Sequence, residues 1–293
     1  MSGTEAELAE PTIGTEVGIA HDWAGSAAGP VTVVLHGGGP GCHAASDFAA
    51  VVARRPGRRW LRVDLPGYGG SPVTADPGLP RIAAAAHALA GLLEELGPGP
   101  VDMLAQSLGG TVALRLAAER PELVGRIVLV GSQPTPAPGG RTDLRTDPAL
   151  GARARAEYYG GDGPDPAKMR ALLSGLEWFD PSLLPKATVQ ARYRASTTAT
   201  ALAAATTPAP AEDLAPVLGA VAAPALVVWG RHDPFAGPDY AAALADTLPR
   251  GDLAVVGRTA HHPQAERPEI VAALADAFLA DASLAEAFRT DRS

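Results

Sequence analysis

Ser107 lies in the stretch of this sequence with the clearest chemical signature, Ala105-Gln-Ser-Leu-Gly109. An apolar run before it predicts a buried strand, and a helical pattern begins at Leu108 and ends before Pro121. A serine at a sharp turn between a strand and a helix is typical of a nucleophile elbow. Ala105 replaces the usual glycine, so the motif is a relaxed one. Because such pentapeptides also arise by chance at strand–helix turns, the rest of the chain must decide.

The two other residue types that a serine nucleophile requires lie downstream. Asp233 follows an apolar run over 224–230, and His261 follows another over 252–257. An imidazole titrates near neutrality and can take the serine proton, while a carboxylate fixes its tautomer and stabilises the imidazolium. We therefore predict a triad of Ser107, Asp233 and His261. The alternatives are a helix-capping role for Asp233, and His262 as the base.

A loop almost without side chains, His36-Gly-Gly-Gly-Pro-Gly41, follows the apolar run over 31–35. A bare backbone lets an N–H group approach a substrate oxygen. We predict that the N–H groups of Gly38 and Leu108 form an oxyanion hole, in which each donor contributes about 10²–10³ in rate. Cys42 and His43 lie beside the loop but lack further ligands, so we expect no metal and no cofactor.

The elements that must position these groups alternate between strand and helix. This order predicts an α/β fold with a mostly parallel sheet covered by helices on both faces. Groups at the carboxyl ends of such strands meet at one edge of the sheet. The expected strands are 31–35, 60–65, 101–104, 126–131, 224–230 and 252–257, with one or two short ones within 12–22; the expected helices are 44–55, 80–96, 108–120, 238–248 and 267–280.

The alternation is interrupted from Gln133 to about Pro210, where no strand is predicted. Helical segments are expected near 148–159, 165–176 and 182–204. We therefore expect an α/β core domain formed by residues 1–133 and 211–293, with a helical lid inserted at 134–210. Residues 1–10 are expected to be a loose tail.

Composition excludes several classes of function. The net charge is −8, from 24 basic and 32 acidic residues, and no basic run is long enough to follow a phosphate backbone, so nucleic acid is not expected as a partner. A single cysteine excludes an internal disulfide. The sequence has no secretory signal pattern and no apolar run of membrane-spanning length. We expect a cytoplasmic protein with a small-molecule substrate and no membrane partner; whether it forms a homo-oligomer is left open.

Five motifs together resemble the α/β-hydrolase superfamily: His36–Gly41, Asp64–Ser71, Ser107–Gly110, Trp229–Asp233, and His261 with Glu266 and Pro268. Within it the chain is most similar to the meta-cleavage-product hydrolases, from residue 30 almost to the end and including part of the lid. These enzymes cut a carbon–carbon bond in vinylogous 1,5-diketone acids. The resemblance implies the α/β-hydrolase fold and hydrolysis by a serine triad.

The resemblance also implies substrate contacts in the lid. Arg192 stands where these enzymes hold the dienoate carboxylate of the substrate, and a guanidinium offers a planar fork to such a group. The alternative is a surface arginine on a lid helix. Trp178 and Phe179 are expected to form walls of the pocket.

Three positions depart from the family pattern, all at the expected polar end of the substrate. Gln106 and Asp47 replace asparagines, and His262 replaces an aromatic residue. An extra carboxylate at Asp47 would disfavour an acidic substrate there. These departures favour an esterase, lactonase or thioesterase, whereas Arg192 and the lid favour carbon–carbon bond cleavage. A non-catalytic receptor on the same fold is a third hypothesis.

Overall fold

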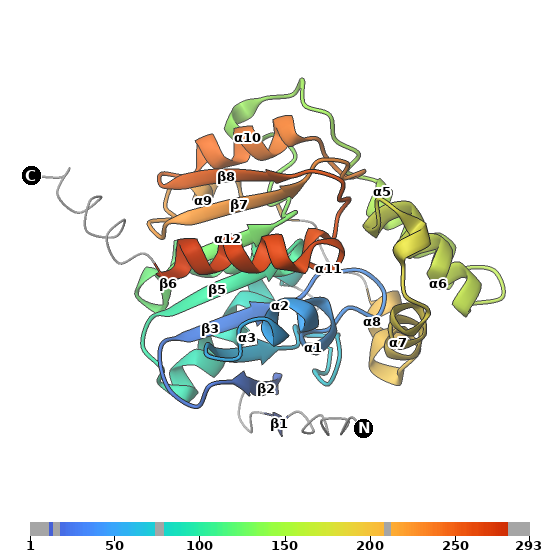
Figure 1. The fold of residues 1–293 in the computed structure, drawn as a ribbon, viewed down its shortest axis with the longest axis horizontal. Coiled ribbons are helices and arrows are strands. Elements are labelled where there is room, and N and C mark those ends of the chain that lie inside the picture. Colours follow the sequence, from blue (N-terminus) through green and yellow to red (C-terminus); the bar gives the residue numbers. More distant parts are fainter. Residues whose placement is uncertain (1–11, 14–17, 74–78, 208–211, 281–293) are drawn as a thin grey trace, which may run out of the picture.

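The computed structural model describes residues 12–13, 18–73, 79–207 and 212–280. The tail expected at residues 1–10 lies outside these ranges. The domain boundary expected between residues 210 and 211 also lies outside them, because the described chain resumes at residue 212. One sheet of eight strands runs through it, in the order β1-β2-β4-β3-β5-β6-β7-β8 (Figure 1). The β1–β2 and β2–β4 pairs are antiparallel, and the pairs from β4 to β8 are parallel. The strands are β1 (Thr12–Ile13), β2 (Ala20–Gly25), β3 (Val31–Leu35), β4 (Arg59–Val63), β5 (Val101–Gln106), β6 (Val124–Val130), β7 (Ala225–Gly230) and β8 (Gly251–Val256).

Helices cover both faces of the sheet, as the alternation predicts. On one face, α2 (Ala49–Ala53) and α12 (Pro268–Ala280) bury a core with β3, β5, β6 and β7, and the short α1 (Ala44–Asp47) and α11 (Pro263–Glu266) lie beside them (Figure 1). On the other face, a larger core forms beneath α3 (Arg81–Leu96), α4 (Leu108–Glu119), α9 (Ala215–Leu218) and α10 (Pro238–Thr247). Strands buried on both sides explain the continuous apolar runs, such as the fully buried β3.

The register brings the ends of four strands to one edge of the sheet. Leu35 lies opposite Ala105, Ala105 lies opposite Leu129, and Val130 lies opposite Val228. The loops that follow β3, β5, β6 and β7 therefore open side by side at the carboxyl edge, where Ser107 follows β5 directly. Reacting groups of open parallel sheets collect at this edge.

The segment between β6 and β7 is largely helical and lies beside that carboxyl edge (Figure 1). It has a small apolar core of its own, built around Tyr158 and Met169. None of the helices in the described ranges is long and apolar enough to cross a membrane. The elements of the segment are α5 (Leu150–Tyr159), α6 (Pro166–Leu172), a π-helical turn η3 (Leu173–Glu177), a 3₁₀ turn η4 (Pro181–Leu183), α7 (Lys186–Ser196) and α8 (Ala199–Thr206), with another 3₁₀ turn, η2 (Pro138–Gly140), before α5.

Two predicted helices are each broken into shorter ones. The helix expected at 44–55 breaks at Phe48, whose φ of −115° and ψ of 11° are not helical and whose ring is fully buried. The helix expected at 182–204 breaks between α7 and α8, where the Thr198 hydroxyl accepts the N–H of Ala201 and caps α8. Burial and capping override the helical pattern at these positions.

Candidate active site

Ser107 adopts an unusual backbone conformation, with φ of 48° and ψ of −110°. Such a conformation costs about 1–3 kcal/mol and persists only where neighbouring structure imposes it. Here the Ser107 N–H donates to the Val130 carbonyl at 2.8 Å, and the Gly109 N–H donates to the His36 carbonyl at 3.1 Å. A Cβ on Gly109 would lie 2.7 Å from the Leu35 and His36 carbonyl oxygens, so only glycine fits this turn. The backbone geometry is that of a nucleophile elbow.

His261 is held by Asp233. Its Nδ1 lies 2.7 Å from Asp233 Oδ2, and the other carboxylate oxygen accepts the Phe235 N–H at 2.9 Å. Asp233 is fully buried. Burial opposes protonation of His261, but the Asp233 carboxylate outweighs it and raises the pKa of His261 above its ordinary value. With Nδ1 bound to the carboxylate, Nε2 is the ring atom that can exchange a proton with a nucleophile.

Ser107 and His261 line one cavity of about 240 Å³. The same cavity is lined by Gly38, Gln106, Glu177 and His262. The structure therefore brings these residues together with Ser107 and His261, two members of the predicted triad. The third, Asp233, lies behind His261. The walls formed by Leu172, Leu176 and Phe235 are apolar.

The predicted oxyanion donors lie next to each other. A Cβ placed on Gly38 would be 3.2 Å from the Cβ of Leu108. Leu108 is the first residue of α4, so its N–H has no acceptor within the helix. Among the described residues, no acceptor is bound to the Gly38 N–H, and the Gly38 carbonyl accepts the Tyr68 hydroxyl at 2.9 Å, which fixes the peptide. Both N–H groups are thus available to a substrate oxygen.

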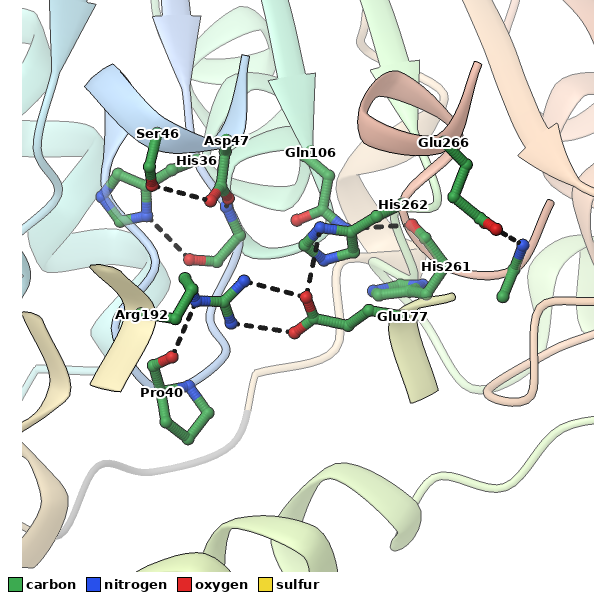
Figure 2. A network of polar contacts seen from close by, with 12 residues as sticks. His36, Pro40, Ser46, Asp47, Gln106, Glu177, Arg192, His261, His262 and Glu266 are labelled. Carbon is green, nitrogen blue, oxygen red and sulfur yellow. Dashed lines mark hydrogen bonds and ion pairs between the residues drawn. The ribbon is translucent and has the colours of Figure 1, made fainter. Parts of the chain in front are cut away.

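Asp47 supports the glycine loop and does not line the cavity. Its Oδ2 accepts the Gly37 N–H at 2.9 Å, and Ser46 donates to its Oδ1 (Figure 2). Asp47 was predicted to contact the substrate directly, but it is not among the residues that line this cavity. The carboxylate acts on the loop that carries Gly38.

Arg192 is bound to a carboxylate that the sequence analysis did not single out. Its Nη1 and Nη2 donate to Glu177 Oε2 and Oε1, each at 2.8 Å, and its Nε donates to the Pro40 carbonyl at 2.9 Å (Figure 2). Both side chains are buried, and Arg192 is not among the residues that line the cavity. The guanidinium is thus engaged, unlike the free carboxylate anchor that the resemblance implies. Glu177 carries no motif of its own, and its only sequence signal is its place beside Trp178.

The charges around this pair are uneven. Burial would raise the pKa values of Glu177 and Asp47, but the combined effects of Arg192, His262 and hydrogen bonds outweigh burial and lower both pKa values. Burial lowers the pKa of His262, against the opposing effects of Glu177 and Asp47. His262 Nδ1 lies 3.4 Å from Glu177 Oε2. Near neutral pH this region therefore holds two carboxylates, one guanidinium and a neutral imidazole.

Two predicted pocket walls lie elsewhere. Trp178 packs against the apolar core of the helical segment, beside Tyr158 and Met169, and does not line the cavity. Phe179 is 38% exposed, and its ring lies 4.4 Å from that of His232. The π-helical turn that ends at Glu177 directs Leu176 and Glu177 to the cavity, and the chain then turns away from it.

Gln106 lines the cavity with an unsatisfied acceptor. Its Nε2 donates to the His261 carbonyl at 3.4 Å, while its Oε1 is buried without a partner among the described residues. Buried polar atoms without a partner are rare in folded proteins. This oxygen lies against the glycine loop, where a Cβ on Gly37 would come within 1.8 Å of it. The predicted contact of Gln106 with the substrate stays a prediction.

The helical segment is fastened to the loop that carries His261. The Glu177 carbonyl accepts the His262 N–H at 3.2 Å. Glu266 bridges the same two segments, because its carboxylate accepts the Phe179 N–H at 2.7 Å and the Ala260 N–H at 2.6 Å. These contacts fix residues 177–179 against residues 260–262.

Comparison with known proteins places this chain in a family. The model of the α/β hydrolase fold family matches residues 31–268. The 2-hydroxymuconate semialdehyde hydrolase of Pseudomonas sp. (strain CF600) is 32% identical over 94% of this chain and 96% of its own. The 2-hydroxy-6-oxononadienedioate/2-hydroxy-6-oxononatrienedioate hydrolase of Burkholderia vietnamiensis is 30% identical over 87% of this chain and 88% of its own.

Solved structures share the fold. A meta-cleavage product hydrolase from Pseudomonas fluorescens IP01 superposes with a TM-score of 0.77 at 21% identity, covering 94% of this chain and 98% of that one. A thermophilic esterase from Thermogutta terrifontis has a TM-score of 0.71 at 24% identity, covering 89% and 92% of the two chains. The chain therefore belongs to the α/β-hydrolase family, and it is similar to the meta-cleavage-product hydrolases of that family.

Proposed function

We propose that this protein is a serine hydrolase that cleaves a carbon–carbon bond next to a carbonyl group in a vinylogous diketone-type acid. The observation that carries the proposal is that His261, which lines the same cavity as the strained Ser107, is held by Asp233 at 2.7 Å. The chain's 30–32% identity to hydrolases named for 2-hydroxy-6-oxo acids and for 2-hydroxymuconate semialdehyde supports this choice of substrate class.

In this mechanism His261 Nε2 takes the proton of the Ser107 hydroxyl as the oxygen adds to the substrate carbonyl. The N–H groups of Gly38 and Leu108 stabilise the resulting oxyanion, and Asp233 stabilises the imidazolium. The carbon–carbon bond then breaks, its electron pair delocalises over the vinylogous system, and the leaving carbon takes the proton from His261. Water, deprotonated by His261, releases the acyl group from the serine as a carboxylic acid.

The helical segment at 134–210 is proposed to act as the lid of this site. Its residues Leu172, Leu176 and Glu177 line the cavity. The segment is linked to residues 260–262, the loop that carries His261, through the backbone contact of Glu177 with His262 and through Glu266. Excluding water strengthens the electrostatic contacts around a developing oxyanion. With a single cysteine in the chain, the protein needs no oxidising compartment, and we place the reaction in the cytoplasm.

A second candidate is an esterase, lactonase or thioesterase activity on the same triad. The observation that favours it is the ion pair between Arg192 and Glu177. Glu177 occupies the Arg192 guanidinium, which was expected to hold a substrate carboxylate. These reactions share the acyl-enzyme chemistry of Ser107 and differ in the leaving group, which is an alkoxide or thiolate in place of a carbanion.

Steady-state kinetics separate the two candidates. The coloured dienoate 2-hydroxy-6-oxo-6-phenylhexa-2,4-dienoate is compared with p-nitrophenyl esters, using the wild type and Ser107→Ala. Turnover of the dienoate that is lost in the variant supports carbon–carbon bond hydrolysis. If only the esters are hydrolysed, the second candidate holds, and if Ser107→Ala retains full activity, both fail.

A further inference from the structure

Two arginines in the wall of the cavity that Ser107 and His261 line have no acidic partner among the described residues. They are Arg81, the first residue of α3, and Arg155 in α5; both are partly exposed. Among the described residues neither forms an ion pair, although Arg153 in the same helix pairs with Asp147. Guanidinium groups that face a cavity with free donors are suited to bind an anion.

Their surroundings leave these charges uncompensated. Arg81 Nη1 lies 3.5 Å from the Tyr68 hydroxyl, and the Arg155 guanidinium lies 5.3 Å from the centre of the Tyr159 ring. Burial raises the pKa of Tyr159 to about 12, so this ring carries no negative charge near neutral pH. The partners of both arginines are therefore neutral and leave their positive charge available to a ligand.

Each arginine contacts a tyrosine that lies near the glycine loop or next to a residue that does. The Tyr68 hydroxyl that Arg81 approaches donates to the carbonyl of Gly38, in the glycine loop His36–Gly41, the predicted oxyanion loop. Tyr159 lies within electrostatic range of both Arg155 and Tyr68. A ligand bound between Arg81 and Arg155 would thus lie near the oxyanion loop, with one contact from the core and one from the helical segment.

The other charged residue in the cavity wall disfavours an anion. Glu177 is negatively charged and already neutralises Arg192, and the buried Asp47 adds a second carboxylate within electrostatic range of that arginine. An acidic substrate that approached Arg192 would have to displace Glu177 from its two hydrogen bonds with that guanidinium. The charges therefore direct a substrate carboxylate away from Glu177.

We infer that Arg81 and Arg155 form the subsite that binds the carboxylate of the substrate, in place of Arg192. The inference rests on the proposed function for the reaction itself and adds the residues that determine its specificity. Because Arg155 belongs to the helical segment and Arg81 to the core, a bound carboxylate also holds the two together over Ser107.

Two chain-matched esters test the subsite: butyl benzoate, which is neutral, and 4-benzoyloxybutanoate, which carries a carboxylate on the leaving-group side, as the dienoate does. Arg81→Gln and Arg155→Gln should each lower kcat/KM for the acidic ester about 10- to 100-fold, mainly through KM, because a charge-assisted contact is lost. The neutral ester should change less than about twofold by the same reasoning. Arg155→Glu should reverse the preference between the esters. Arg153→Gln, which changes the same helix outside the cavity, is the matched control.

Binding measurements separate the subsite from the chemistry. Calorimetric titration of Ser107→Ala with 4-benzamidobutanoate and with N-butylbenzamide, the amide counterparts of the two esters, measures the carboxylate contact without turnover. Tighter binding of the acid, lost on adding Arg81→Gln or Arg155→Gln, supports the subsite even if the proposed reaction fails. Equal effects of these variants on acidic and neutral ligands, no effect, or an equal effect of Arg153→Gln would overturn it.

Discussion

The guanidinium of Arg192 and the carboxylate of Glu177 form a buried bidentate ion pair, with both N–O distances at 2.8 Å. Through its Nε, Arg192 also binds the carbonyl of Pro40, in the oxyanion loop. Through its backbone carbonyl, Glu177 binds the N–H of His262. The pair therefore connects the helical segment to both loops that carry the predicted catalytic groups.

Glu177→Gln should destabilise the protein by about 3–5 kcal/mol, because it leaves the buried charge of Arg192 with a weakened partner. Chemical denaturation measures the loss. The double variant Glu177→Leu with Arg192→Met removes both charges and should be much closer to wild type. Arg141→Gln, which breaks the exposed pair of Arg141 with Asp143, should have no measurable effect. A Glu177→Gln protein as stable as wild type would show that the pair contributes no net stability.

Ser107→Ala should reduce kcat by about 10⁴- to 10⁶-fold while the melting temperature stays near that of wild type. In the proposed mechanism the hydroxyl is the nucleophile, whereas the backbone strain belongs to the turn and remains in the variant. Kinetics and thermal melting are measured on the same preparation, with labelling by a fluorophosphonate as a second readout. Ser182→Ala, at an exposed serine in η4, is the control. A large fall in melting temperature would instead assign Ser107 a structural role.

The fold was predictable because its signals are local and repeated. The apolar runs of β3 and β7 are buried on both faces of the sheet, and that pattern distinguishes them from the rest of the chain. The elbow was predictable for a related reason, since small residues at 109 and 110 are required by close packing against Leu35 and Ser132.

The substrate contacts were less predictable because they depend on side-chain partners far apart in the sequence. From the sequence, Arg192 is expected to be a cation free to bind a substrate carboxylate. In the folded chain it is paired with Glu177, which lies fifteen residues earlier in the sequence. Trp178 and Glu177 are adjacent in the sequence, yet after the π-helical turn only Glu177 lines the cavity. Arg81 and Arg155 carry no motif, and only the three-dimensional structure shows that they share a wall with Ser107.

Asp233→Asn should lower kcat by about 10⁴-fold and shift the pH profile. The base must be neutral to take a proton, so kcat/KM of the wild type should fall as pH drops through the pKa of His261, which Asp233 raises above the ordinary value. Without that carboxylate, the burial of His261 dominates and its pKa falls. The acid limb of kcat/KM should therefore move to lower pH in the variant. An unmoved limb would mean that another group titrates.

The adjacent histidines should differ sharply in their contribution to turnover. His261 binds Asp233 and can serve as the base, whereas His262 lies beside Glu177, and its buried ring has a lowered pKa. His261→Ala should therefore reduce kcat for a neutral ester by about 10⁴-fold or more. His262→Phe should keep the same activity within about tenfold, because it removes a contact to Glu177 and leaves the proton transfer intact. Measuring both variants at a pH above the acid limb avoids confusing titration with loss of the base. If His262→Phe were the inactive variant and His261→Ala the active one, the contact between His261 and Asp233 would be structural and the base would have to be reassigned.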